Sequence, residues 1–146
     1  MHLLDDDDRR FRSVFEAGTF PAAEFNHRAH VRLAYAYLVE SDDEAAFASM
    51  RAALLAFLER NGVPMSKYHE TMTRAWILAV RHFMEISAPS ESANAFIDAN
   101  PRLLDAKIML THYSAELLFS DRARSRFVEP DLGRIPRHPH ENDEGS

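Results

Sequence analysis

Apolar residues recur along this chain at spacings of three and four, and this periodicity is the feature that most constrains its fold. One face of a predicted helix carries His69, Thr73, Trp76, Val80 and Phe83. Glycine, which weakens helices, occurs only four times in 146 residues. We therefore expect an all-α protein, folded as a compact single-domain bundle of five or six helices.

Capping residues and proline predict how the chain is divided. We expect a weakly helical N-terminal segment in residues 1–24, a helical domain in residues 25–128, and an extended tail in residues 129–146 that is disordered at least after Arg137. Within the domain, helix starts are predicted from side chains that can accept the first free N–H groups or that favour the first turn. These starts are Asn26, Ser41 with Glu44, about Ser66, Asn100 with Pro101, and Ser120.

Composition excludes several classes of protein and site. The net charge of −6 does not favour binding to nucleic acid or to anionic membranes. The absence of cysteine excludes thiolate zinc sites, iron–sulfur clusters and disulfides. No apolar run is long enough to span a bilayer, and the N-terminus does not have the pattern of a signal peptide. We expect a cytoplasmic protein without nucleic-acid or membrane partners, and a homo-oligomer is compatible with the sequence.

Three histidines fall on the predicted buried faces of two helices. His27 and His30 are neighbours on a helix surface, and His69 shares a face with Trp76. A buried imidazole needs partners for both ring nitrogens, so such a group suggests a metal site or a proton-transfer site. If the two helices pack side by side, the three rings can converge on one divalent transition metal, iron or zinc.

Neighbouring polar residues suggest roles around this ion. Glu70 is a candidate ligand or general base, Tyr113 a candidate hydrogen-bond donor to substrate, and Thr73 a candidate partner that orients the His69 ring. The leading hypothesis is a small metal-dependent enzyme, oxygen-using or hydrolytic, that acts on a small metabolite in a pocket between the two helices. The alternative is a metal-free ligand-binding or regulatory helical module in which the histidines are structural.

Two segments also carry a resemblance. The segment from Asn26 to His30 contains a His-x-x-His spacing, and the segment from Tyr68 to Trp76 reads YHETMTRAW. Together with Tyr113 to Ser120 and the Pro130 to Leu132 segment, they resemble a family of small uncharacterised all-helical bacterial proteins. The resemblance covers most of residues 20–136 and implies that these segments form one unit, and it implies no activity.

Overall fold

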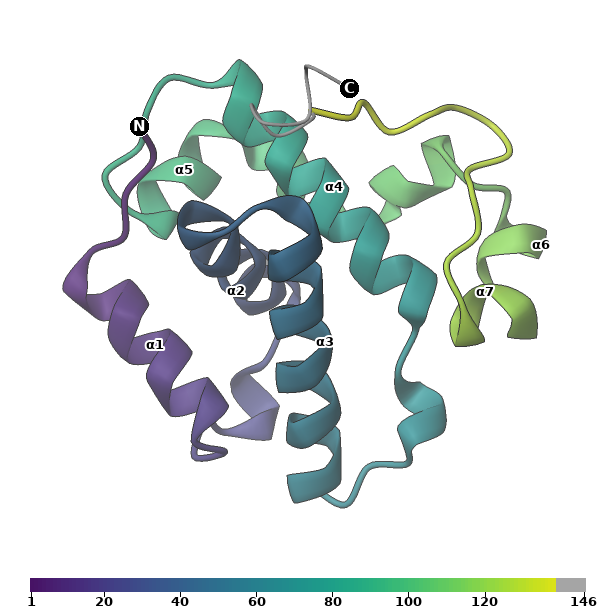
Figure 1. Ribbon diagram of the computed structural model, residues 1–146, viewed down its shortest axis with the longest axis horizontal. Coiled ribbons are helices and arrows are strands. Elements are labelled where there is room, and N and C mark those ends of the chain that lie inside the picture. Colours follow the sequence, from purple (N-terminus) through teal and green to yellow (C-terminus); the bar gives the residue numbers. More distant parts are fainter. Residues whose placement is uncertain (139–146) are drawn as a thin grey trace.

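The computed structural model describes residues 1–138 and is built from helices in that range (Figure 1). The longer helices are α1 (Asp6–Glu16), α2 (His27–Glu40), α3 (Asp43–Arg60), α4 (Glu70–Ile86) and α5 (Ala93–Ala99). Two short helices follow, α6 (Ala115–Leu118) and α7 (Asp121–Ser125). Short 3-10 helices lie between them: η1 (Ala22–Glu24), η2 (Met65–Lys67), η3 (Pro101–Leu104) and η4 (Ala106–Thr111). The all-α prediction is confirmed.

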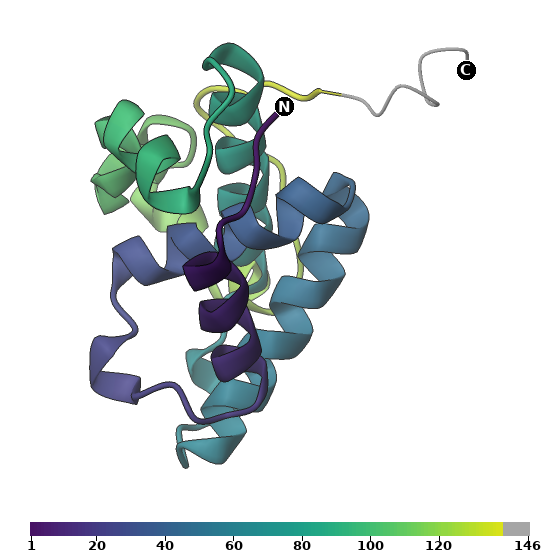
Figure 2. The same ribbon diagram turned by 90° about the vertical axis from the view of Figure 1, so that its left-hand side faces the viewer.

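Helix α2 lies at the centre of the molecule and contacts α1, α3, α4 and α5 (Figures 1 and 2). From Val31 to Leu38, all its side chains except that of Arg32 are buried. A helix that is apolar on all sides must be covered on all sides. Helices α3 and α4 pack on α2 and on each other, and Trp76 of α4 is only 3% exposed.

The first 24 residues contribute more than the weak segment that we expected. Asp5 caps α1 and forms a capping box with Asp8, and Phe15 of α1 is 1% exposed. The Phe15 ring stacks on the Phe57 ring of α3, with centroids 4.7 Å apart. Gly18, at φ +80°, then turns the chain towards α2. Helix α1 therefore belongs to the same hydrophobic core as α2 and α3.

Two predicted helix starts were wrong by one to four residues. Helix α3 is capped by Asp42, whose side chain accepts from Ala45 N–H, while Ser41 bonds back to the Tyr37 carbonyl of the preceding helix. Helix α4 does not begin at about Ser66, because Ser66 lies in η2. Its N-cap is His69. In each case another side chain satisfies the free N–H groups of the first turn. After α3 ends, Gly62 has a φ of +66°, the left-handed conformation that often follows a helix end.

The segment after α5 departs most from the prediction. Asn100 and Pro101 open two 3-10 helices, η3 and η4, and not an α-helix. The Asn100 side chain donates to the Phe96 carbonyl and to Ser87 Oγ, so it cannot cap a new helix. The predicted cap at Ser120 is confirmed, because it accepts from Ala123 N–H at the start of α7.

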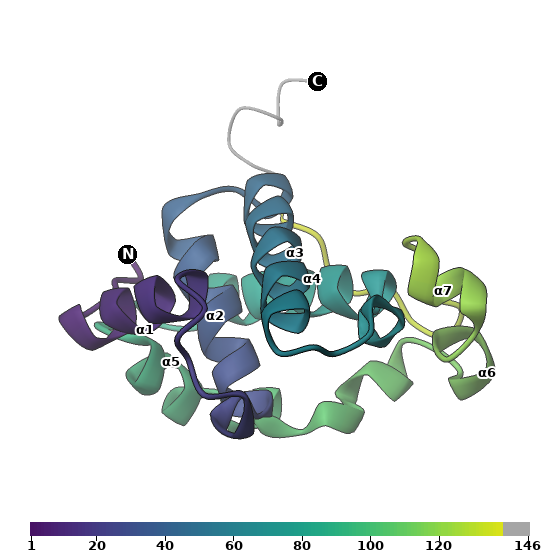
Figure 3. The ribbon, with the colours of Figure 1, turned by 90° about the horizontal axis from the view of Figure 1, so that it is seen from below.

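Residues 101–138 form a C-terminal layer that crosses one side of the bundle (Figure 3). Helix α7 packs on α4, and an extended segment without regular secondary structure then runs back along α4. Val128 and Ile135 of this extended part are 6% and 4% exposed, so it is bound to the core. The predicted disorder falls mainly on residues 139–146, which lie outside the described residues. None of the described helices is long and apolar enough to cross a membrane.

Candidate functional site

His27 and His30 lie in the first turn of α2, which begins where the Asn26 side chain accepts from Ala29 N–H. Nε2 of His27 donates to the Leu103 carbonyl of η3 at 2.8 Å. The His27 ring also meets the Trp76 ring of α4 edge-on, with centroids 4.6 Å apart. His27 therefore links α2 to both η3 and α4. The bond to Leu103 uses only Nε2, and the second ring nitrogen, Nδ1, takes no part in it.

His30 is unusual because a buried nitrogen of its ring has no partner. Its Nδ1 is the one buried side-chain nitrogen or oxygen without a hydrogen bond among residues 1–138. The ring lies parallel to that of His27, with centroids 6.3 Å apart, and next to Phe25. Burial, and to a smaller extent the His27 charge, lower the pKa of His30 to about 4. His30 is therefore a neutral imidazole at physiological pH.

His69 is the N-cap of α4, a role that the sequence did not suggest. Its Nδ1 accepts from Met72 N–H at 3.1 Å, and its Nε2 donates to the Leu118 carbonyl of α6 at 2.7 Å. This pair of bonds requires a neutral ring with the proton on Nε2. Desolvation lowers the pKa of His69, and the nearby Arg124 charge adds to this effect. Both nitrogens are occupied by backbone groups.

The residues predicted to support His69 are also engaged elsewhere. The Glu70 carboxylate accepts from Tyr68 Oη at 2.7 Å and from Arg51 Nε at 3.0 Å. The Thr73 hydroxyl donates to the backbone carbonyl of His69 at 2.8 Å, so it contacts the helix start and not the ring. Burial and the bond to Glu70 raise the pKa of Tyr68. Glu70 therefore sits in a local network between η2, α3 and α4.

Tyr113 is fully buried and holds the extended C-terminal part of the chain. Its hydroxyl donates to the Val128 carbonyl at 2.7 Å, and burial raises its pKa to about 12. Thr71 of α4 acts on the same part of the chain, since its hydroxyl donates to the Arg126 carbonyl and accepts from Val128 N–H. To donate to a substrate, Tyr113 would have to give up a buried hydrogen bond.

The predicted metal ligands do not form one ligand set in the described range. Among residues 1–138, no three His, Asp or Glu side chains are close enough together to hold a metal ion. His27 and His30 are adjacent, whereas His69 is committed to α4 and α6. Metal binding therefore stays a prediction. A small hollow beside Leu78, Phe127 and Ile135 has a volume of about 20 Å³, room for about one water molecule.

Four histidines share one role, which the sequence did not reveal. Each uses a ring nitrogen to bond a backbone carbonyl that is distant in sequence: His2 to Met84, His27 to Leu103, His69 to Leu118, and His112 to Gly133. His2 also accepts from Ser90 N–H through its other ring nitrogen. We call these four residues the carbonyl-bonded histidines. His27 and His69 join the C-terminal layer to α2 and α4, His2 joins the N-terminal segment to α4, and His112 makes a bond within the C-terminal layer.

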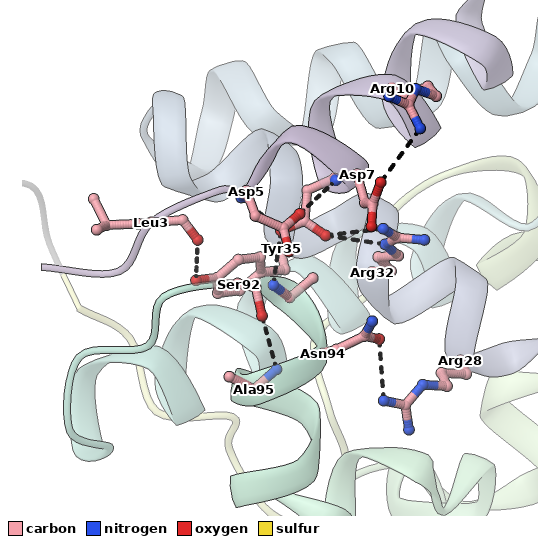
Figure 4. Close-up of polar contacts among 12 residues, drawn as sticks. Leu3, Asp5, Asp7, Arg10, Arg28, Arg32, Tyr35, Ser92, Asn94 and Ala95 are labelled. Atoms are coloured by element: carbon pink, nitrogen blue, oxygen red, sulfur yellow. Dashed lines mark hydrogen bonds and ion pairs between the residues drawn. The ribbon is translucent and has the colours of Figure 1, made fainter.

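An ion pair between α1 and α2, whose carboxylate is buried, was also not predicted from the sequence. The Asp8 side chain is 1% exposed and accepts from Arg32 Nη2 at 3.0 Å and Arg32 Nε at 3.1 Å. The same carboxylate accepts from Ala93 N–H at the first turn of α5 and from Asp5 N–H. Figure 4 shows Asp5, Arg32, Tyr35 and Ser92 gathered at this junction. Asp8 is the last of four consecutive aspartates, and only the structure separates this buried member from the others.

A pair of substitutions tests the structural role of His69. His69→Ala should lower the free energy of unfolding by about 1–3 kcal/mol, because Met72 N–H and the Leu118 carbonyl both lose a partner. His69→Asn should lose less, since asparagine is a good N-cap. Urea denaturation followed by circular dichroism measures both. Equal losses for the two variants would show that the cap does not contribute.

Comparisons with known proteins return no match to this chain. No family model matches it, and no curated protein and no solved structure is significantly similar to it. The family resemblance suggested by the two segments therefore stays a prediction, and no function is transferred from a relative.

Proposed function

We propose that this protein is a metal-free helical binding or regulatory module in which the histidines are structural. The observation that supports this most directly is the pair of bonds made by His69. A neutral imidazole has one donor and one acceptor, and Met72 N–H and the Leu118 carbonyl occupy both. To bind a metal through either nitrogen, His69 would have to release the start of α4 or its contact with α6.

The other carbonyl-bonded histidines follow the same logic. His2 uses both nitrogens, and His27 and His112 each use one to hold a distant carbonyl. An N–H donated to a buried carbonyl contributes about 1 kcal/mol and fixes which segments meet. In this proposal the histidines keep the C-terminal layer in place, and the surface of that layer carries the function.

Metal analysis tests the proposal. Purified untagged protein, grown in medium with added iron and zinc, should carry far less than one metal ion per chain. A strong chelator should leave its melting temperature unchanged. A metal ion raises the melting temperature only if it binds the folded state, and this proposal includes no such ion. A stoichiometric ion, lost together with thermal stability on chelation, would overturn the proposal.

A metal-dependent enzyme is the second candidate, and one observation favours it. The unpartnered Nδ1 of His30 lies next to His27, and a buried polar atom without a partner calls for a water, an ion or a ligand. The lowered pKa keeps His30 in the neutral form that binds metals. If the second candidate is right, His27→Ala and His30→Ala should each reduce metal content, and His69→Asn should not.

A further inference from the structure

The arginines of the C-terminal layer are paired very differently from those of the rest of the chain. In residues 1–100, eight of nine arginines have a nitrogen within 4.0 Å of a carboxylate oxygen, namely Arg9, Arg10, Arg12, Arg28, Arg32, Arg51, Arg74 and Arg81. The ninth, Arg60, donates to the Glu16 carbonyl. In residues 101–138, only one of six arginines has a carboxylate within this distance, namely Arg137, which pairs with Glu129.

Three of the remaining five arginines are grouped on one short element. Arg122, Arg124 and Arg126 lie in or directly after α7 and are exposed, while Ala123 between them packs into the core. We call these three residues the α7 arginines. Helix α7 lies at the edge of the molecule farthest from α1 and its acidic first turn (Figure 3). No described carboxylate is within ion-pair distance of the α7 arginines.

An exposed aromatic residue directly precedes α7 in the chain. Phe119 ends α6, one residue before the cap of α7, and is 53% exposed. Arginine and aromatic residues are the types that contribute most to protein–protein interfaces. A planar guanidinium binds a carboxylate through two parallel hydrogen bonds. Phe119 and the α7 arginines therefore provide one exposed apolar side chain and three guanidinium groups that can bind carboxylates.

We propose that Phe119 and the α7 arginines form a docking surface for an acidic segment of a partner protein, a segment that also carries an apolar side chain. This inference rests on the proposed function, because it names the partner of the module. The observations favour a polypeptide over a nucleic acid. Residues 101–138 contain seven Lys and Arg against five Asp and Glu, an excess of only two, within a chain of net charge −6. A long polyanion would meet repulsion beyond the patch, whereas a short acidic segment would not.

Binding of a defined probe to the full chain tests the proposal. The probe is a short fluorescein-labelled peptide rich in glutamate with one leucine, measured by fluorescence anisotropy at low salt. Replacing the α7 arginines together by glutamine should weaken binding about tenfold. The matched control is the triple variant Arg9→Gln, Arg10→Gln and Arg28→Gln, which changes the charge equally at arginines that already have carboxylate partners. The control should bind within about twofold of the unmodified protein.

Further arms separate the alternatives. Phe119→Ala should weaken binding of the leucine probe but not of a leucine-free version. Equal losses in the two triple variants, or no binding of the probe, would overturn the proposal. Tighter binding of single-stranded DNA of equal charge would show that the partner is a nucleic acid. Binding only after Glu141, Asp143 and Glu144 are neutralised would assign the surface to the chain's own end. Metal content does not enter these measurements, so the two proposals fail independently.

Discussion

Asp8→Ala should destabilise the protein by up to about 3–5 kcal/mol, the range for removing one partner of a buried ion pair, because Asp8 is buried while Arg32 is 21% exposed. The substitution leaves the Arg32 guanidinium beside the Phe11 ring without its carboxylate, with 4.6 Å between Cζ and the ring centroid. It also removes the acceptor for Ala93 N–H in a buried position. Urea denaturation followed by circular dichroism at neutral pH measures the loss.

The adjacent carboxylate provides the control for this prediction. Asp7 is 75% exposed and pairs with Arg10, itself 74% exposed, at 3.4 Å. Asp7→Ala should change stability by less than about 1 kcal/mol, because exposed ion pairs contribute little. Similar losses for the two variants would mean that the Asp8 junction is not a stabilising contact.

Acidification should destabilise the protein through His30. Its pKa is 6.5 in the unfolded chain and about 4 in the folded protein, so the unfolded state binds the proton first as pH falls. The free energy of unfolding is therefore unaffected by His30 above about pH 6.5. It falls as the pH is lowered towards 4, by up to about 3 kcal/mol from this residue alone. Denaturation midpoints measured across this range give the slope.

His30→Leu isolates this contribution from other groups that titrate. The variant should lose the part of the pH dependence that comes from residue 30. At pH 7 it should be as stable as the unmodified protein or more so, since the buried Nδ1 without a partner is removed. An unchanged slope in the variant would show that His30 is not the group responsible.

The sequence predicted the helices better than it predicted the site. Periodicity and caps such as Asn26 and Ser120 act within one turn, so they can be read locally, and α2 and α7 begin where expected. Ser66 failed as a start because His69, which is rarely considered as a cap, accepts the N–H of α4 instead. Helix α1 was underestimated because its stability comes from Phe57 and Arg32, which are distant in sequence.

The site could not be predicted for a related reason. His27 and His69 were singled out correctly as residues whose nitrogens need partners, but spacing does not distinguish a metal from a carbonyl. The partners are the backbone groups of Leu103 and Leu118, 76 and 49 residues away. Any residue at those two positions supplies the same backbone carbonyl, so the sequence carries no record of the contact.

The anchoring of α1 has a consequence for how the chain is made. The contacts that fix its N-terminal end reach residues translated much later: Leu3 N–H to the Ser90 carbonyl, Nε2 of His2 to the Met84 carbonyl, and the Asp8 carboxylate to Ala93 N–H. A contact can form during synthesis only after both of its residues have left the ribosome. Helix α1 therefore leaves the ribosome well before the residues that complete its contacts. Until Ala93 is available, α1 is held by its contacts with α2 and α3, which include the Asp8–Arg32 ion pair and the stack of Phe15 on Phe57.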